Sequence, residues 1–498
     1  MDLRPNLSPV ESPQCFPRRG RLRDSVLIIF SAAVFFSAAV SIAGEPNAQV
    51  PIVEEAVSTL SRYLRVNTSN PPGNEIGAAR FWKEFFDREG IPCEIILPAP
   101  GSKRANVVAR LAGNGKGKSV VLLNHLDVVP AGSRHWSRPP FSGEISDGAV
   151  WGRGATDMKG TAVAQAYVLT DLSRRGVHPQ RDLIFLGTAD EESGRENGAA
   201  WILQQRPEIV AGAELLLTEG APARQNDSSQ VESFSIVATE KSPLWLRITA
   251  SGLAGHASIP DPASAPDRLL RALCSLQEFR PDFVVTPVAR RYFAQLAEME
   301  PERLGPLFRD LDAALANPAF RQRLASDPGL SAMVKNTCQV TRLAGGEKIN
   351  VVPAESSAEL DCRLLPGESP QVFLSRLKIA SGDPDLVWDV LSSYSANDSP
   401  LDTELVRTVE RIVSKRAPKA RVLTPVLTAS NDAHLFRDAG IMSYGFDPFP
   451  LGDDDERAHG DDERMPISSF RFGFELYLAV VESYATNRAL GDTVGARR

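Results

Sequence analysis

Three stretches of the chain carry short, continuous apolar runs: residues 119–124, 183–188 and 214–217. A strand covered on both faces has this pattern, because neither set of its side chains reaches water. Elsewhere in this half, apolar positions recur at helical spacing or form shorter strand-like runs. These patterns predict helices at 50–65, 76–89 and 161–174, and strands at 93–97 and 105–111. Helices that alternate with buried strands indicate an α/β layer with a largely parallel or mixed sheet.

The pattern changes near residue 242. Apolar and polar positions alternate from Leu244 to Thr249, which is typical of a half-exposed strand in an antiparallel sheet. The following sequence predicts a helix at 266–279, charged helical sequence from 281 to 335, and strands at 339–343 and 355–364. Alternating α/β signals then return, with helices at 402–414 and 468–486 and a strand at 442–446.

The simplest architecture is one α/β domain interrupted by a smaller α+β domain. We predict that the larger domain comprises 50–241 and 368–487, that the smaller one spans 242–367 with a helical insertion at 281–335, and that 488–498 form a polar tail. Leu365–Glu368, with its Pro-Gly pair, is the expected second boundary.

The N-terminus predicts a targeting segment. Four arginines between positions 18 and 23 precede an apolar run at 25–43, which ends in the small-residue pattern Ser41-Ile42-Ala43. This combination is typical of a secretory signal peptide. The run is also close to the length of a membrane span, so an uncleaved membrane anchor remains open. Either alternative places the body of the protein outside the cytoplasm, in the periplasm or secreted.

Composition narrows the class of protein. The chain has 498 residues, of which 43% are apolar and 23% charged, as in ordinary globular proteins of more than one domain. A mean hydropathy of −0.16 excludes a multi-span membrane protein. The net charge of −7 argues against a nucleic-acid partner. Five scattered cysteines without a CxxC pair form no zinc motif, and a single disulfide stays open.

Histidines and carboxylates follow the ends of the predicted strands. His125 and Asp127 come after one buried strand, Glu191 and Glu192 after the next, and Glu219 after a third. Asp157 precedes a helix, and His459 lies in a polar loop. Because ligands bind at the carboxyl ends of strands in open α/β sheets, these side chains should converge on one crevice.

Such a cluster has a chemical meaning. Crowded carboxylates repel one another and raise each other's pKa, and a pair of divalent cations resolves that repulsion. Imidazole and carboxylate without thiolate suit Zn²⁺ in a catalytic site. Two metals ~3.5–4 Å apart need a bridging carboxylate. The spare carboxylate beside the ligands is what a general base requires.

Several motifs resemble one known family. HLDVVP, WSRPPFSGEISDGAVWGRGATDMKG and DEESG are similar to motifs of the aminoacylase/carboxypeptidase family of di-zinc metallopeptidases, family M20. GHASIP, NVVPAE and LDCRLLPG resemble its lid elements. The resemblance runs from about residue 50 to 485 and implies a zinc-peptidase-like α/β/α catalytic domain with a mixed sheet, interrupted by a ferredoxin-like α+β lid or dimerisation domain.

The resemblance implies two Zn²⁺ per chain, with Co²⁺ or Mn²⁺ as substitutes, and a role for each motif residue. His125 and Glu219 would bind the first zinc, Glu192 and His459 the second, and Asp157 would bridge both. Asp127 would orient the His125 ring. Glu191 would be the general base that takes a proton from the metal-activated water and later protonates the leaving amine.

The resemblance also assigns the substrate side. His256 of the lid would stabilise the oxyanion, Arg363 would grip a substrate carboxylate, and Asn350 would add a donor. His434 lies in a segment similar to a substrate-side loop, whereas His135 and His178 match no ligand motif. Two departures stand out: Thr218 replaces an acid that many relatives carry, and the insertion at 281–335 resembles that of carboxypeptidase S and the secreted N-acyl-amino-acid hydrolases.

We therefore expect a di-zinc amidohydrolase that cleaves an N-acyl amino acid or a short peptide with a free carboxylate. A di-zinc aminopeptidase and a catalytically silent binding protein on the same fold are the alternatives. Many relatives pair through the lid, but the helical insertion could cover that edge. A homodimer, and the action of His256 within one chain or across a dimer, therefore remain open.

Overall fold

The structure is a computed structural model of the chain, and it describes residues 51–132, 135–194, 196–302 and 304–487. The predicted signal peptide or anchor at 1–43 and the tail at 488–498 lie outside the described residues. Among the helices that the structure describes, none combines the length and apolar character needed to cross a bilayer.

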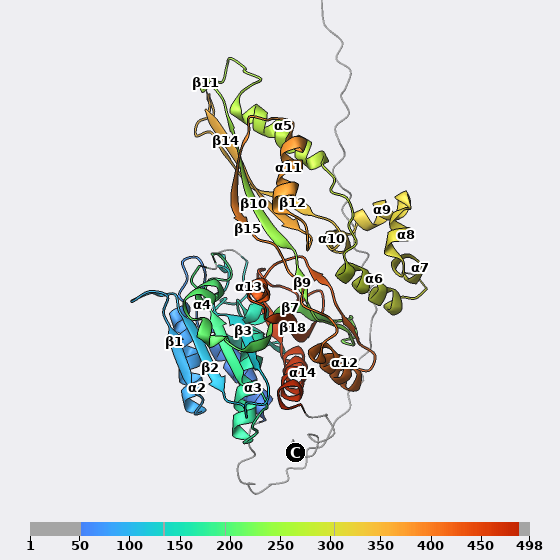
Figure 1. Cartoon of the computed structure of the whole chain (residues 1–498). Helices are drawn as coiled ribbons and strands as arrows, with labels where there is room; N and C mark the ends of the chain where they lie inside the picture. The colour runs from blue at the N-terminus through green and yellow to red at the C-terminus, as the bar shows by residue number, and fades with distance from the viewer. Residues whose placement is uncertain (1–50, 133–134, 195, 303, 488–498) are drawn as a thin grey trace, which may run out of the picture. The chain divides into compact units, whose positions relative to one another are not determined.

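An eight-stranded mixed sheet lies at the centre of the larger domain (Figure 1). The strand order is β1-β2-β6-β3-β7-β8-β16, and β18 pairs with β7. Strands β6, β3, β7 and β18 run parallel, and the remaining pairs include antiparallel ones, so the predicted mixed sheet is confirmed. The strands are β1 (Cys93–Ile96), β2 (Asn106–Leu111), β3 (Ser119–His125), β6 (Leu183–Thr188), β7 (Ala213–Gln225), β8 (Val231–Ser235), β16 (Arg421–Leu423) and β18 (Met442–Leu451).

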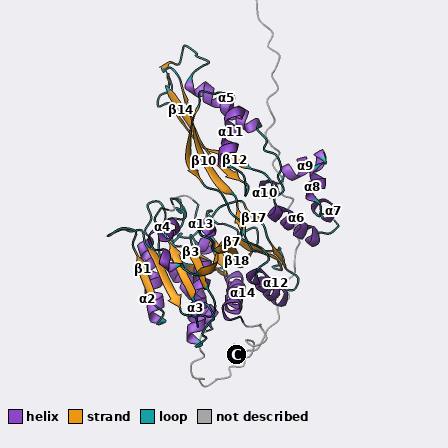
Figure 2. Cartoon of the chain, in the orientation of Figure 1, coloured by secondary structure: helices purple, strands orange, loops and turns teal. Residues whose placement is uncertain are grey.

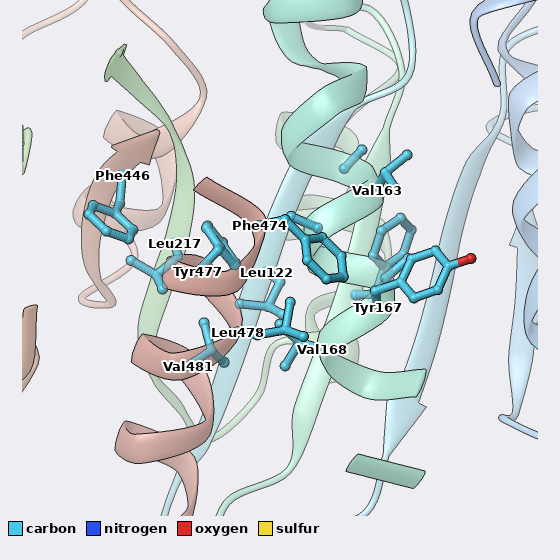
Figure 3. Packing of buried hydrophobic residues seen from close by; sticks show 14 of the residues in the cluster. Leu122, Val163, Tyr167, Val168, Leu217, Phe446, Phe474, Tyr477, Leu478 and Val481 are labelled. Carbon is cyan, nitrogen blue, oxygen red and sulfur yellow. The ribbon is translucent and has the colours of Figure 1, made fainter. Parts of the chain in front are cut away.

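Helices cover both faces of this sheet, which explains the continuous apolar runs. On β3, Leu122 packs into the larger cluster, with residues of α3 and α14 (Figure 3), while Val121 and Leu123 face the opposite cluster with α4 and α13. The helices of the first face are α1 (Ile52–Leu64), α2 (Glu75–Arg88), α3 (Gly160–Arg174), α12 (Glu404–Arg416) and α14 (Ile467–Thr486); those of the second are α4 (Ala199–Gln205) and α13 (Ala433–Asp438).

A four-stranded antiparallel sheet lies in the region predicted to be the lid (Figure 2), in the order β12-β14-β10-β15. Leu244, Leu246 and Ile248 face its core, and Trp245 and Arg247 between them are exposed, as the alternation predicts. Its elements are β10 (Ser242–Ser251), α5 (Ala265–Glu278), β12 (Thr337–Gly345), β14 (Glu355–Leu364), α11 (Pro370–Ser381) and β15 (Val387–Ser393).

The lid sheet extends beyond the predicted boundary at 367. Strand β15 pairs with β10, and Phe373 and Leu377 of α11 belong to the lid core. We therefore place the second boundary after Ser393; the division into two domains itself stays a proposal. Cys338 and Cys362 face each other on β12 and β14 and form a disulfide, which settles the bridge that the sequence left open.

The insertion is helical, as predicted, and has a small core of its own. Phe293, Phe308 and Phe320 pack together, and Val426 of β17 (Val426–Leu427) joins them. Asn317 caps one of its helices through its side chain, with Pro318 at the first helical position. The helices are α6 (Pro287–Met299), α7 (Gly305–Phe308), α8 (Leu311–Leu315), α9 (Pro318–Ala325) and α10 (Pro328–Ala332).

Several short strands, which no sequence pattern predicts, pair with one another and so connect the loops. β19 pairs with β5, and β5 with β4, beside the turn that carries Asp157. The remaining pairs are β17 with β9 and β13 with β11. Their bounds are β4 (Glu144–Ser146), β5 (Ala149–Trp151), β9 (Thr239–Glu240), β11 (Gly255–His256), β13 (Val351–Val352) and β19 (Arg464–Pro466).

Candidate metal centre and active site

The parallel strands deliver the candidate ligands to one edge of the sheet. His125 is the last residue of β3, Glu191 and Glu192 follow the end of β6, and Glu219 lies in β7. β18 approaches β7 closely at this point: a Cβ atom on Gly220 would lie 2.7 Å from the main-chain carbonyl carbon of Gly445. The glycine after Glu219 therefore lets the two strands pack side by side.

Asp157 lies between the two histidines. Its Oδ1 is 3.0 Å from Nε2 of His125, and its Oδ2 is 3.1 Å from Nε2 of His459. Each imidazole also has one glutamate beside it: Glu219 Oε2 is 3.4 Å from His125 Nε2, and Glu192 Oε2 is 3.3 Å from His459 Nε2. The five side chains thus form two sets of three that share Asp157.

These separations fit two metal ions. A tetrahedral site with bonds of about 2.0–2.1 Å to nitrogen and oxygen has ligand atoms roughly 3.3 Å apart. The four measured separations lie between 3.0 and 3.4 Å. All donors are imidazole nitrogens or carboxylate oxygens, the set that suits Zn²⁺ in a catalytic site. The structure therefore brings the five sequence-predicted ligands close together, and Glu191 also lies within reach of a metal: His125, Asp157 and Glu192 form one candidate group, and His125, Glu191 and Glu219 another. The division into two ligand sets stays a prediction.

Neighbouring carboxylates raise the pKa values of three side chains in the cluster, as expected of crowded negative charge, which favours bound cations. Burial opposes the charge of His125, but Glu219 and Asp157 outweigh it and hold the pKa of His125 well above its usual value. Hydrogen bonds to Asp157 and Glu192 raise the pKa of His459 to about 10. Burial, and then the charge of Asp157, raise the pKa of Glu219 to about 7. Cations that bind here displace protons from the imidazoles, so metal affinity falls as the pH falls.

Asp127 joins the His125 ring to the turn with the two glutamates. The Nδ1–H of His125 donates to the main-chain carbonyl of Asp127 at 2.9 Å, while the carboxylate lies 3.8 Å from Nδ1. That carboxylate instead accepts the main-chain N–H groups of Glu191 and Glu192, at 3.2 and 3.1 Å. Asp127 therefore meets the ring through its backbone, and its side chain fixes the segment that holds Glu191.

A cavity of about 540 Å³ opens beside this cluster. Asp157, Glu191, Glu192, Glu219 and His459 line one part of it. Apolar and aromatic side chains line another part, namely Pro243, Trp245, Tyr394, Leu427 and Leu451, and polar side chains such as Ser430 and Asp447 lie among them. The candidate metal ligands and a partly apolar binding surface therefore line the same cavity.

Arg363 also lies in the cavity wall. Its Nε and Nη2 donate to both carboxylate oxygens of Asp361, and its Nη1 donates to the Ser430 hydroxyl at 3.0 Å. The fork of the guanidinium is thus held by neighbours on the lid and on the larger domain.

His256 and Asn350 lie together on the lid, but neither is among the cavity residues. His256 pairs with Val351 across β11 and β13, and the N–H of Ala257 donates to the Asn350 carbonyl at 3.2 Å. Both residues are exposed. The structure therefore does not bring these two predicted substrate residues to the metal centre.

The other histidines divide clearly. His135 and His178 are exposed, whereas His434 is buried and stacks on Tyr394 with ring centroids 3.7 Å apart. His434 Nδ1 donates to the carbonyl of Asn431, whose amide in turn donates to the carbonyl of Glu219 at 3.2 Å. His434 thus stands two contacts away from a candidate ligand.

Sequence reasoning missed two buried acids near the centre. Asp447, at the end of the predicted strand, lines the cavity; burial, followed by the charges of Glu219 and Asp157, raises its pKa well above the usual value. Glu463 accepts hydrogen bonds from the turn that carries Asp157. The run of acids around His459 was a signal for Glu463, but it did not single out one residue.

The fold and the cluster define a metallopeptidase or aminoacylase-type hydrolase. The chain belongs to peptidase family M20/M25/M40, which its sequence matches over residues 121–483. It is 28% identical to aminoacylase-1 of Sus scrofa over 444 residues, which cover 87% of this chain and 96% of that protein. It is also 28% identical to a probable carboxypeptidase S-like 2 of Dictyostelium discoideum over 402 residues, 76% of each chain.

Among solved structures, the fold resembles that of the M20 family metallo-carboxypeptidase Sso-CP2 from Sulfolobus solfataricus. The TM-score is 0.67 at 19% sequence identity, and the match covers 86% of this chain and 99% of that one. These findings confirm the family that the motifs indicated.

Proposed function

We propose that the protein is a di-zinc amidohydrolase that cleaves the amide bond of an N-acyl amino acid or short peptide with a free carboxylate. One observation carries this proposal: the two oxygens of Asp157 face two histidines, each with its own glutamate, and Asp157 lines a cavity whose wall also contains Arg363. A guanidinium in the wall suits a substrate carboxylate, which favours this proposal over an aminopeptidase.

His125, Asp157 and Glu219 would hold one ion, and His459, Asp157 and Glu192 the other. Two such ions would polarise the scissile carbonyl and lower the pKa of water at the centre. Glu191 lines the cavity beside the ligands. It would accept one proton from the attacking water and return it to the nitrogen of the leaving amine. Asp127 serves this step because it fixes the main chain of Glu191.

The cavity supports a substrate with one charged and one apolar part. Arg363 would bind the carboxylate, and its bonds to Asp361 and Ser430 hold the guanidinium at the wall. Trp245, Tyr394 and Leu427 would contact an apolar acyl group or side chain. This division of the cavity favours N-acyl amino acids and dipeptides over long peptides.

We further propose that His256 and Asn350 reach the substrate across a homodimer formed through the lid. Both lie outside the cavity wall, near exposed apolar side chains such as Leu253 and Ile259, which are 82% and 75% exposed. The edge strand β15 presents Val387 and Val390, and the insertion packs its α6 on β16 and β17 instead of on this edge. An open edge with apolar side chains is suited to pairing with a second copy.

An extracytoplasmic location is part of the proposal. It rests on the basic and apolar sequence at 18–43, whether that segment is a cleaved signal or an anchor. The disulfide between Cys338 and Cys362 supports it, since such bonds persist in oxidising compartments.

The role of Glu191 is tested with Glu191→Gln in the zinc-loaded enzyme, assayed on a panel of N-acyl amino acids and dipeptides. We expect both metals to remain, because Glu191 is not a proposed ligand, and kcat to fall by about 10²–10⁴-fold. Glu475→Gln, on the exposed side of α14, is the control. Exhaustive chelation should abolish wild-type turnover and zinc should restore it. Near-normal kcat in the Glu191 variant, or activity that survives chelation, would contradict the proposal.

A further inference from the structure

Glu463 lies four residues after His459 in the loop between β18 and β19, and its side chain is fully buried. Its carboxylate accepts hydrogen bonds from five donors, all of which belong to the segment 153–157. Oε2 accepts from Arg153 Nη1 at 2.6 Å and the Gly154 N–H at 2.9 Å. Oε1 accepts from the Thr156 N–H and Oγ1, both at 2.9 Å, and from the Asp157 N–H at 3.3 Å.

This segment needs an outside partner because its backbone is irregular. Gly154 has a positive φ of 86°, and Asp157 and Met158 have non-helical angles just before α3 begins. A regular helix would satisfy these N–H groups internally after its first turn, but an irregular turn cannot. The carboxylate of Glu463 takes the place of the missing carbonyl acceptors.

We propose that Glu463 is a positioning residue for the metal centre. Glu463 holds the turn of Asp157 so that each carboxylate oxygen of Asp157 faces one histidine. The inference rests on the ligand set of the proposed function. The backbone completes the link: the Gly152 N–H donates to the Glu463 carbonyl at 3.0 Å, and β19 pairs with β5 directly beyond. One residue thus joins the turn of the shared ligand Asp157 to the loop that carries His459.

The alternative is that Glu463 and Arg153 are a buried ion pair that stabilises the fold alone. The two roles predict different effects of a substitution at Glu463. A structural pair changes the unfolding temperature of the metal-free protein, whereas a positioning residue changes the affinity and geometry of the metal site in the folded protein. Mutation of a residue that holds a metal ligand without binding the metal itself typically weakens metal affinity by about 10–100-fold.

The experiment is a titration of metal-free Glu463→Gln with zinc against a chromophoric chelator, and with cobalt(II) followed by its visible absorption. The amide would place an N–H group against groups that are themselves donors, so the turn would shift. We expect the affinity of the protein for each of the two zinc ions to weaken by about 10–100-fold, and the visible absorption spectrum of bound cobalt(II) to change. Glu482→Gln, a buried acid of α14 paired with Arg175, is the matched control and should bind both ions as the wild type does.

A milder variant keeps the test decisive if Glu463→Gln does not fold. Thr156→Val removes one of the five hydrogen bonds and should weaken zinc binding by a smaller factor in the same direction. Wild-type zinc affinity with a wild-type cobalt spectrum in the folded variant would overturn the inference, even if the unfolding temperature falls. A wild-type protein that binds no pair of ions would instead refute the proposed function, so the two failures are distinguishable.

Discussion

Single side chains at the centre have separate tasks. Asp157 offers one oxygen to each histidine, Asp127 fixes the main chain of Glu191 and Glu192, and Glu463 holds the turn of Asp157. The closeness of His125, Glu192 and Glu219 was predictable from the sequence, because acids and histidines at the carboxyl ends of neighbouring parallel strands lie at one edge of the sheet. Asp157 and His459 lie outside such strand ends, and only the family motifs pointed to them. The role of Glu463 was not predictable, since it depends on an irregular turn some three hundred positions earlier in the chain.

A buried lysine at the root of the lid predicts that stability depends on pH. Lys241 is fully buried, and its Nζ donates to the Lys335 carbonyl at 2.8 Å and to Thr337 Oγ1 at 2.9 Å. Burial, followed by the charges of Arg363 and Lys335, lowers the pKa of Lys241 from 10.5 to about 7. Between these two values the unfolded chain holds a proton that the folded chain has released.

Stability that comes from Lys241 should therefore rise as the pH rises from 7 to 10. We expect Lys241→Met to flatten this part of the profile of unfolding free energy against pH, by up to a few kcal/mol across the window. Urea unfolding at several pH values measures it, with Lys378→Met on the exposed side of α11 as the control. Parallel profiles for wild type and Lys241→Met would refute the assignment.

At the scale of elements, the sequence predicts a strand well when burial of the strand produces a continuous or alternating pattern of apolar residues. The runs of β3 and β6 are buried on both faces and read as continuous apolar sequence, and β10 alternates because one face is covered. Strand β15 was missed because it is mostly exposed and carries neither pattern. The boundary at 367 stays a prediction, and the pairing of β15 with β10 favours our later placement after Ser393.

A glutamine of α6 hydrogen-bonds the insertion to the larger domain. Gln295 Nε2 donates to the Val422 carbonyl at 3.2 Å, and its Oε1 accepts from the N–H and Oγ1 of Thr424 at 2.9 and 3.1 Å. These contacts join a helix of the insertion to β16 and the residue after it.

Gln295→Ala should destabilise the protein by about 1–3 kcal/mol, because buried groups of Thr424 lose their partner. A lower urea midpoint at unchanged slope would measure it. Gln322→Ala, on the exposed surface of α9, is the matched control and should leave the midpoint in place. An equal effect of the two substitutions would show that the hydrogen bonds of Gln295 do not stabilise the fold.

For the whole molecule, the lid contributes one of its predicted substrate residues to the cavity wall. The lid carries Arg363 into the cavity wall, while His256 stays at the exposed pair of β11 and β13. A second copy that pairs along β15 would supply His256 in trans under our proposal.

The proposed homodimer predicts complementation between two inactive variants. Glu191→Gln and His256→Ala should each be nearly inactive alone, and co-refolding them should restore activity, since some mixed dimers contain one intact site. Val390→Lys on the edge strand should shift the sedimenting species from dimer to monomer. A monomer in the wild type, or no recovery in the mixture, would contradict an action of His256 across the dimer.

The sharing of Asp157 by two ions is the feature on which the proposed function depends most. An anomalous difference map at the zinc edge, from crystals of the zinc-loaded protein, tests it most directly. We predict two peaks ~3.5–4 Å apart, one among His125, Asp157 and Glu219 and the other among His459, Asp157 and Glu192. A single peak, or peaks away from Asp157, would contradict the account.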